Sequence, residues 1–178
     1  MSIAASSHPW FYIRKSRIRG AGRGLFLTRI GALHIRREGL KFIDLPFFGI
    51  KLFTQSQEWP YAAMTVHLTK GVILQCPLHV HEGKCLANFA NEPQRQPRNS
   101  TAPILVEGQD VSKPNAILVS NKNCEQTRDQ YPAYIQINCE KLSGSYGWIE
   151  EDFEVLYWYT EGHTYDTRRY PRTDRYFS

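Results

Sequence analysis

The stretch SRIRGAGRGLF, residues Ser16–Phe26, is the most informative part of the sequence. Its glycines alternate at Gly20, Gly22 and Gly24, and arginines lie on both sides of them. Glycine is favoured where the backbone takes a positive φ or lies too close to a neighbour for a side chain. We therefore expect a loop pressed against a ligand. A glycine-rich hairpin without a ligand is the plainer alternative.

Two common nucleotide-binding loops do not fit this stretch. A dinucleotide-binding turn needs a third glycine where Leu25 stands, and no helical periodicity follows it. A P-loop needs lysine and then serine or threonine after the last glycine, where the chain has Leu25 and Phe26. Both classes of site are excluded.

Length and composition indicate one strand-rich domain. The chain has 178 residues, with ten tyrosines and four tryptophans, and blocks of helix-forming residues are scarce. It has no apolar run long enough to cross a membrane and no secretory signal at its start, so we expect an intracellular protein without membrane contact. The four cysteines form no C-x-x-C pair, which favours free thiols over a zinc site or disulfides.

Positive charge is concentrated in the N-terminal half. Nine lysines and arginines between Arg14 and Lys41 face one acid, Glu38, and four arginines lie between Arg168 and Arg175. Such density is typical of a surface that binds nucleic acid or an acidic protein, although a solvated face is more common. Because no readout motif accompanies the charge, we rank nucleic-acid contact as the lesser alternative.

Alternating and continuous apolar runs predict the strands. In Leu33–Arg37 the alternation places Leu33 and Ile35 on one buried face. Pro46 and Gly49 exclude a long helix across Phe42–Phe53. The predicted strands are Pro9–Lys15, Leu25–Thr28, Leu33–Arg37, Met64–Leu68, Val72–Leu74, Ala116–Val119, Tyr134–Ile137 and Phe153–Tyr159.

The second notable stretch is LANFANEP, residues Leu86–Pro93, in which apolar residues enclose Asn88 and Asn91. A buried amide without a hydrogen bond costs about 1–3 kcal/mol, so both side chains need partners. They either cap local turns or tie down a crossing of the chain and offer polar groups to a cofactor.

A metal site is the main alternative that the residues suggest. On a strand, His79 and His81 share a face, and His67, Glu82 or Cys85 are candidates to complete a ligand set. Surface histidines in a loop are the more ordinary interpretation.

The motif S-x-I-x-G-A-G-R-G-L-F, followed by Asn88-Phe89-Ala90-Asn91 and by the Tyr-x-Tyr of Phe153–Tyr159, resembles the SET-domain family of protein lysine methyltransferases. The resemblance implies a mostly β (α+β) SET domain of small curved sheets, with a pseudoknot-like chain crossing and few short helices. It would span residues 9–165, with an exposed insertion at 93–113 and a basic, aromatic tail at 166–178.

The match to the family's motifs is incomplete. The family's Tyr-x-Gly motif is not recognisable, Glu92 stands where the family has histidine, and its distal Pro-Asn corresponds to Pro114-Asn115.

The resemblance also implies a function. It predicts methyl transfer from S-adenosylmethionine to a lysine of a protein or peptide, such as a histone tail. The protein would be located in the nucleus if its substrate is a histone and otherwise in the cytoplasm. Tyr159 would be catalytic and Tyr157 would control the methylation state. The cofactor would be bound by Gly22, Arg23, Gly24, Leu25, Asn88, Phe89, Asn91, Glu92 and Tyr61. The alternatives are an inactive SET-fold interaction module and a metal-binding β-fold that uses His79 and His81.

Overall fold

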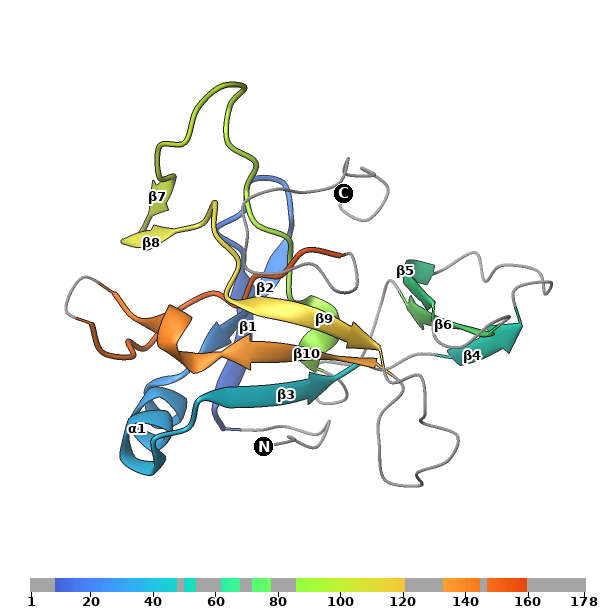
Figure 1. Ribbon diagram of the computed structural model, residues 1–178, viewed down its shortest axis with the longest axis horizontal. Helices are drawn as coiled ribbons and strands as arrows, with labels where there is room; N and C mark the ends of the chain where they lie inside the picture. Colours follow the sequence, from blue (N-terminus) through green and yellow to red (C-terminus); the bar gives the residue numbers. More distant parts are fainter. Residues whose placement is uncertain are drawn as a thin grey trace.

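The computed structural model describes residues 9–47, 50–53, 62–67, 72–77, 86–120, 133–144 and 147–159. These residues form mainly short strands in small antiparallel sheets, with one α-helix and two short 3₁₀-helices (Figure 1). The predicted mostly β class is therefore confirmed. Within the same residues, no helix is both long enough and apolar enough to span a bilayer.

The central sheet has three antiparallel strands in the order β3, β10, β9 (Figure 1). These are β3 (Phe42–Pro46), β10 (Ala133–Asn138) and β9 (Ala116–Ser120). In β10 the side chains alternate between buried and half-buried, as the period of a strand requires. The strands predicted at Ala116–Val119 and Tyr134–Ile137 are both confirmed. Buried apolar side chains of the sheet include Ile43, Leu45, Leu118, Ile135 and Ile137.

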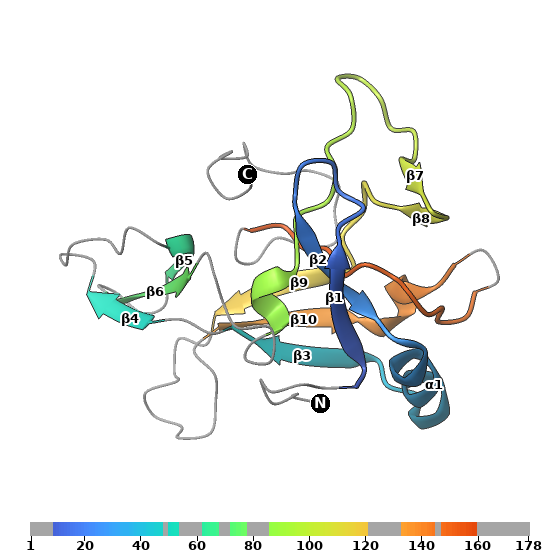
Figure 2. The ribbon, with the colours of Figure 1, turned by 180° about the vertical axis from the view of Figure 1, so that it is seen from behind.

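A hairpin of β1 (Phe11–Lys15) and β2 (Arg23–Leu27) packs against this core, and residues 16–22 of the glycine stretch form its loop. Leu25, Phe26 and Leu27 are fully buried. Both predicted strands are confirmed, although β2 begins and ends slightly earlier than expected. In Figure 2 the hairpin crosses the strands of the central sheet.

The strand predicted at Leu33–Arg37 is wrong, because these residues belong to helix α1 (Arg29–Glu38). Ile35 is fully buried whereas Leu33 is 42% exposed, so the two do not share a face. Thr28 caps the start by accepting a hydrogen bond from the Gly31 amide, and Gly39 ends the helix with φ 62. These caps select the helical period over the alternation.

A second three-stranded antiparallel sheet has the order β4, β6, β5 and lies beyond one end of the central sheet (Figure 1). Its strands are β4 (Ile50–Phe53), β5 (Ala62–His67) and β6 (Val72–Pro77). The strands predicted at Met64–Leu68 and Val72–Leu74 are confirmed as an antiparallel pair. β5 begins two residues earlier than predicted, β6 continues to Pro77, and Leu68 lies outside the described residues.

The segment 93–113, expected to be an exposed insertion, is only partly exposed. Its tip contains a small hairpin of β7 (Leu105–Val106) and β8 (Gln109–Asp110), and Leu105 is 69% exposed. However, Gln109 and Val111 are buried, because they pack beside the Phe153–Tyr159 segment and Ile18.

Candidate functional site

The Phe153–Tyr159 segment runs through the centre of the site. It was predicted to be a strand with two different faces, but the structure gives it only single bridges, from Glu154 to Phe26, from Leu156 to Asn91 and from Tyr157 to Ala116. All residues from Glu154 to Trp158 are buried. The prediction of a regular strand is therefore wrong. The segment has neighbours on both sides, so its central residues do not reach solvent, whereas Phe153 and Tyr159 at its ends are half-buried.

Backbone hydrogen bonds place this segment between β2 and the asparagine motif. The Val155 amide donates to the carbonyl oxygen of Leu25 at 2.8 Å, and the Tyr157 amide donates to that of Asn91 at 3.0 Å. The segments that carry the three sequence motifs therefore meet.

Asn91 joins the asparagine motif to the glycine stretch. Its side chain is buried, and its amide nitrogen donates to the carbonyl oxygen of Arg23 at 2.9 Å. The motif begins as the 3₁₀-helix η1 (Leu86–Phe89), so Asn91 follows a short turn. The bond joins two segments that are far apart in the sequence, and the crossing of the chain at Asn91 stays a prediction. Asn88 and Phe89 are half-buried nearby on η1.

Glu154 is a buried acid at this meeting point, and sequence reasoning did not single it out. Its carboxylate accepts hydrogen bonds from the Ser16 hydroxyl at 2.6 Å and from the Arg17 amide at 2.7 Å. Burial raises the pKa of Glu154 above 4.5, although the bonds from Ser16, Arg17 and Asn91 act in the opposite direction. The sequence feature that could have pointed to Glu154 is its position as the one charged residue in the otherwise apolar segment Phe153–Tyr159.

The close approach expected at the glycines occurs at Gly24, and the neighbour is Glu154. A Cβ atom at Gly24 would lie 2.5 Å from Oε2 of Glu154 and 3.3 Å from Nδ2 of Asn91. Glycine at this position is therefore explained by the packing of the chain against itself.

Gly20 and Gly22 are glycines for a different reason. Both have positive φ, at 75° and 71°, and a Cβ atom on either would meet nothing within 4 Å. Gly22 and Arg23 are exposed, whereas Gly24 and Leu25 are buried. Of the four loop residues predicted to bind a cofactor, only Gly22 and Arg23 present an accessible surface.

Asn115 and Gln109 hold the backbone of the segment from the other side. The Asn115 amide donates to the carbonyl oxygen of Glu154 at 2.8 Å and accepts from the Leu156 amide at 2.9 Å. Gln109 makes the equivalent pair of bonds with the carbonyl oxygen and amide of Glu154, both at 2.8 Å. Each of these buried side-chain amides thus makes the backbone hydrogen bonds that a neighbouring strand would otherwise make to this segment.

The two tyrosines predicted to be catalytic lie against each other, with ring centroids 4.9 Å apart. Tyr157 is only 1% exposed, whereas Tyr159 is half-buried. The Tyr159 hydroxyl donates to the carbonyl oxygen of Ala90 at 3.2 Å, and its amide donates to Oε1 of Glu92 at 3.1 Å. The Tyr159 side chain and backbone are therefore held by the asparagine motif.

A cluster of ion pairs supports the glycine loop. Arg14 and Arg17 both bind Asp152 and Glu107, with nitrogen–oxygen distances of 2.8–3.1 Å. Arg17 is the more buried of the two arginines, and it also donates to the carbonyl oxygen of Asp152. The cluster joins the start of the loop to the β7–β8 hairpin and to the turn before Phe153.

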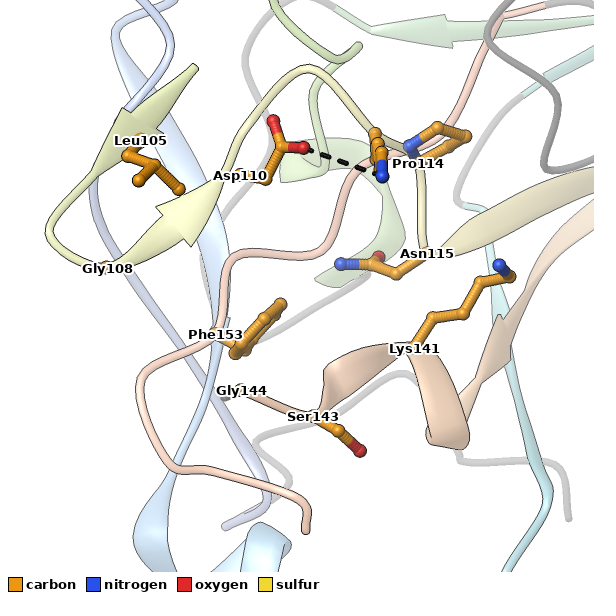
Figure 3. Close-up of a pocket in the computed structure, with 10 residues that line it drawn as sticks. Leu105, Gly108, Asp110, Pro114, Asn115, Lys141, Ser143, Gly144 and Phe153 are labelled. Carbon is orange, nitrogen blue, oxygen red and sulfur yellow. Dashed lines mark ion pairs between the residues drawn. The ribbon is translucent and has the colours of Figure 1, made fainter. Parts of the chain in front are cut away.

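A cavity of about 270 Å³ lies beside this site (Figure 3). It is lined by Leu105, Gly108, Asp110, Lys113, Pro114, Asn115, Lys141, Ser143, Gly144 and Phe153. Lys113 and Asp110, which both line it, form an ion pair at 3.9 Å. None of the residues predicted to bind a cofactor lines this cavity.

Some predicted site residues lie outside the described residues. These are Tyr61, the histidines His79 and His81, and the tail 166–178. Across the described ranges, no group of three or more His, Cys, Asp or Glu residues is placed to hold a metal ion.

Comparison of the sequence with protein-family models and with curated proteins gave no match.

Proposed function

We propose that this chain is a SET-type methyltransferase that transfers a methyl group from S-adenosylmethionine to a lysine side chain of a protein, such as a histone. The observation that carries the proposal is the contact of Asn91 with both other motifs. Its side chain binds the carbonyl oxygen of Arg23, and its own carbonyl oxygen accepts from Tyr157. The proposal includes a pseudoknot-like crossing at Asn91, a SET domain over residues 9–165 and a separate tail at 166–178.

The accessible residues at the meeting point offer backbone polar groups and an aromatic ring to a cofactor. Gly22 and Arg23 present an exposed loop, and the Arg23 guanidinium lies 5.4 Å from the centre of the half-buried Phe89 ring. In this proposal the Gly22 and Arg23 backbone, Asn88 and Phe89 contact the cofactor. Leu25 and Gly24 act indirectly, because Leu25 binds Val155 and Gly24 faces Glu154.

The tyrosine pair suits the substrate side of the reaction. Bound S-adenosylmethionine supplies a methyl group activated by the positive sulfur. The substrate amine must be neutral to accept it, and a dry passage between aromatic rings disfavours the ammonium form. Tyrosine rings also stabilise the cationic sulfonium and the methylated amine, and a hydroxyl lone pair can orient an amine. We assign the hydroxyl role to Tyr159, because Tyr157 is almost fully buried.

An inactive SET-fold interaction module is the second candidate. The observation that favours it is the burial of Tyr157, together with the hydrogen bond that the Tyr159 hydroxyl already makes to Ala90. Both tyrosines then act as packing residues.

Transfer of a radioactive methyl group to core histones and to a lysine peptide array separates the two candidates. The active enzyme labels at least one lysine substrate, and Tyr159→Phe lowers the rate by about 100-fold or more. Tyr134→Phe is the matched control, because Tyr134 is half-buried in β10, and it retains the rate. No labelling by the wild-type chain favours the inactive module, and full activity of Tyr159→Phe removes Tyr159 from the mechanism.

A further inference from the structure

Helix α1 carries an exposed face that the proposed site does not use. Five residues form it, and we call them the α1 outer face: Arg29, Ile30, Leu33, Arg36 and Arg37. At 3.6 residues per turn they lie within an arc of about 120°. The buried residues Gly31, Ala32 and Ile35 lie on the opposite side of the helix. In both views α1 lies at the edge of the molecule (Figure 1 and Figure 2).

Two large apolar side chains are exposed on this face. Ile30 is 61% exposed and Leu33 is 42% exposed. They are three positions apart on the helix, so they are neighbours on its surface. Ordinary solvent-facing helix positions are polar, and an adjacent apolar pair on such a face favours contact with another molecule.

The arginines of this face are not used by the fold. Among the residues that the structure describes, Arg29, Arg36 and Arg37 form no ion pair. The contrast is with Arg14 and Arg17, which are both paired with acids.

Acids next to the face do not neutralise it. Glu38 lies on a different side of the helix, about 180° from Arg29. Glu151 and Asp152 line a shallow hollow beside Arg29. Asp152 is bound by Arg14 and Arg17, and among the described residues the exposed Glu151 forms no ion pair with Arg29. The face therefore combines three positive charges with an apolar pair.

We propose that the α1 outer face is a docking surface for a protein segment that presents acidic side chains around an apolar centre. This inference does not rest on the proposed methyl transfer. Arginine forms paired hydrogen bonds with carboxylates, and an apolar centre on the partner would bury Ile30 and Leu33. Acidic side chains around that centre complement the arginines and guide the two surfaces together.

Two other occupants fit less well. The phosphate backbone of a nucleic acid would pair with the arginines but would leave Ile30 and Leu33 without an apolar partner. A lipid surface requires apolar residues on one side and charges at the margins, whereas Arg37 lies between Leu33 and Ile30 around the helix. A bilayer that covers both apolar residues would bury the Arg37 charge as well.

The test uses the ¹⁵N-labelled full chain and four probes. The first is an amphipathic peptide of glutamate and leucine, and the second is the same peptide with serine in place of leucine. The others are a DNA duplex and vesicles that contain phosphatidylserine. At about 150 mM salt, we expect the glutamate–leucine peptide to shift the amide signals of the α1 outer face and to bind more tightly than the other three.

Matched variants complete the test. Arg29→Glu with Leu33→Gln weakens peptide binding by about tenfold, and glutamate near the helix N-terminus does not weaken the helix. The control, Arg98→Glu with Leu105→Gln, makes the same changes at an exposed arginine and an exposed leucine elsewhere and retains binding. Equal loss in both variants, signal changes away from α1, or tighter binding of DNA or vesicles would each overturn the proposal.

Discussion

The carboxylate of Glu154 occupies the space that a side chain at Gly24 would need. A Cβ atom at Gly24 would lie 2.5 Å from Oε2 of Glu154, and the same oxygen accepts a hydrogen bond from Ser16. The glycine stretch and the Phe153–Tyr159 segment are thus fitted to each other through one buried acid.

Gly24→Ala is expected to be more destabilising than Gly22→Ala. The alanine at position 24 meets a carboxylate that is held by hydrogen bonds, so the cost is about 2–3 kcal/mol in the free energy of unfolding. At Gly22 only the backbone conformation opposes alanine, because φ is 71° and the space is open, and the cost is about 1 kcal/mol. Urea unfolding measures both, and equal costs would refute this explanation of Gly24.

The effects of changing Gly24 and Glu154 should not be additive. Glu154→Ala is destabilising by itself, because the Ser16 hydroxyl and the Arg17 amide lose their acceptor. In that background, however, the closest atom to the alanine Cβ at position 24 is Nδ2 of Asn91, at 3.3 Å, and the additional cost of Gly24→Ala falls below about 1 kcal/mol. A double-mutant cycle gives the coupling energy. A cycle with no coupling would mean that the two residues do not meet.

Ionisation of Glu154 should lower the stability of the fold as the pH rises. Burial raises its pKa above 4.5, so the folded state holds the proton more tightly than the unfolded state. The associated stability is present below pH 4.5 and is lost as the pH rises through the raised pKa. We expect the unfolding free energy of wild type minus that of Glu154→Gln to fall across this window. A difference that rises with pH would contradict the burial of the charged group.

Asn115→Asp should destabilise the protein strongly, whereas Asn138→Asp should not. Aspartate at 115 still accepts from the Leu156 amide, but it cannot donate to the carbonyl oxygen of Glu154, and it places a charge in a buried site. We expect a loss of about 3 kcal/mol or more. Asn138 caps the 3₁₀-helix η2 (Cys139–Leu142), and aspartate serves equally well as a cap. Thermal unfolding of the two variants provides the comparison.

The sequence predicted the fold best where one period was clear. Tyr134–Ile137 alternates in a way that only a strand satisfies, and it became β10. In Leu33–Arg37 five residues were too few to separate a period of 2 from a period of 3.6. The helix is fixed by its caps Thr28 and Gly39, which both lie outside Leu33–Arg37. A threonine and a glycine at this spacing predict a helix between them.

The site was predictable in outline but not in detail. Three separated motifs were expected to meet, and bonds of Asn91 to Arg23 and to Tyr157 join them. Glu154 was missed because its partner Ser16 lies 138 positions away, and local patterns carry no information on such a contact. The same limit explains why Gly24 was interpreted as facing a ligand.

Binding of S-adenosylmethionine to the full chain tests the central proposal most directly. Titration calorimetry should detect one cofactor molecule per chain, and amide signals of Gly22 and Arg23 should shift in nuclear magnetic resonance spectra of the labelled protein. The exposed backbone at these two residues and the adjacent Phe89 ring are the basis for this expectation. Absence of binding, or binding with shifts confined to residues far from Gly22, Asn91 and Tyr159, would contradict the account.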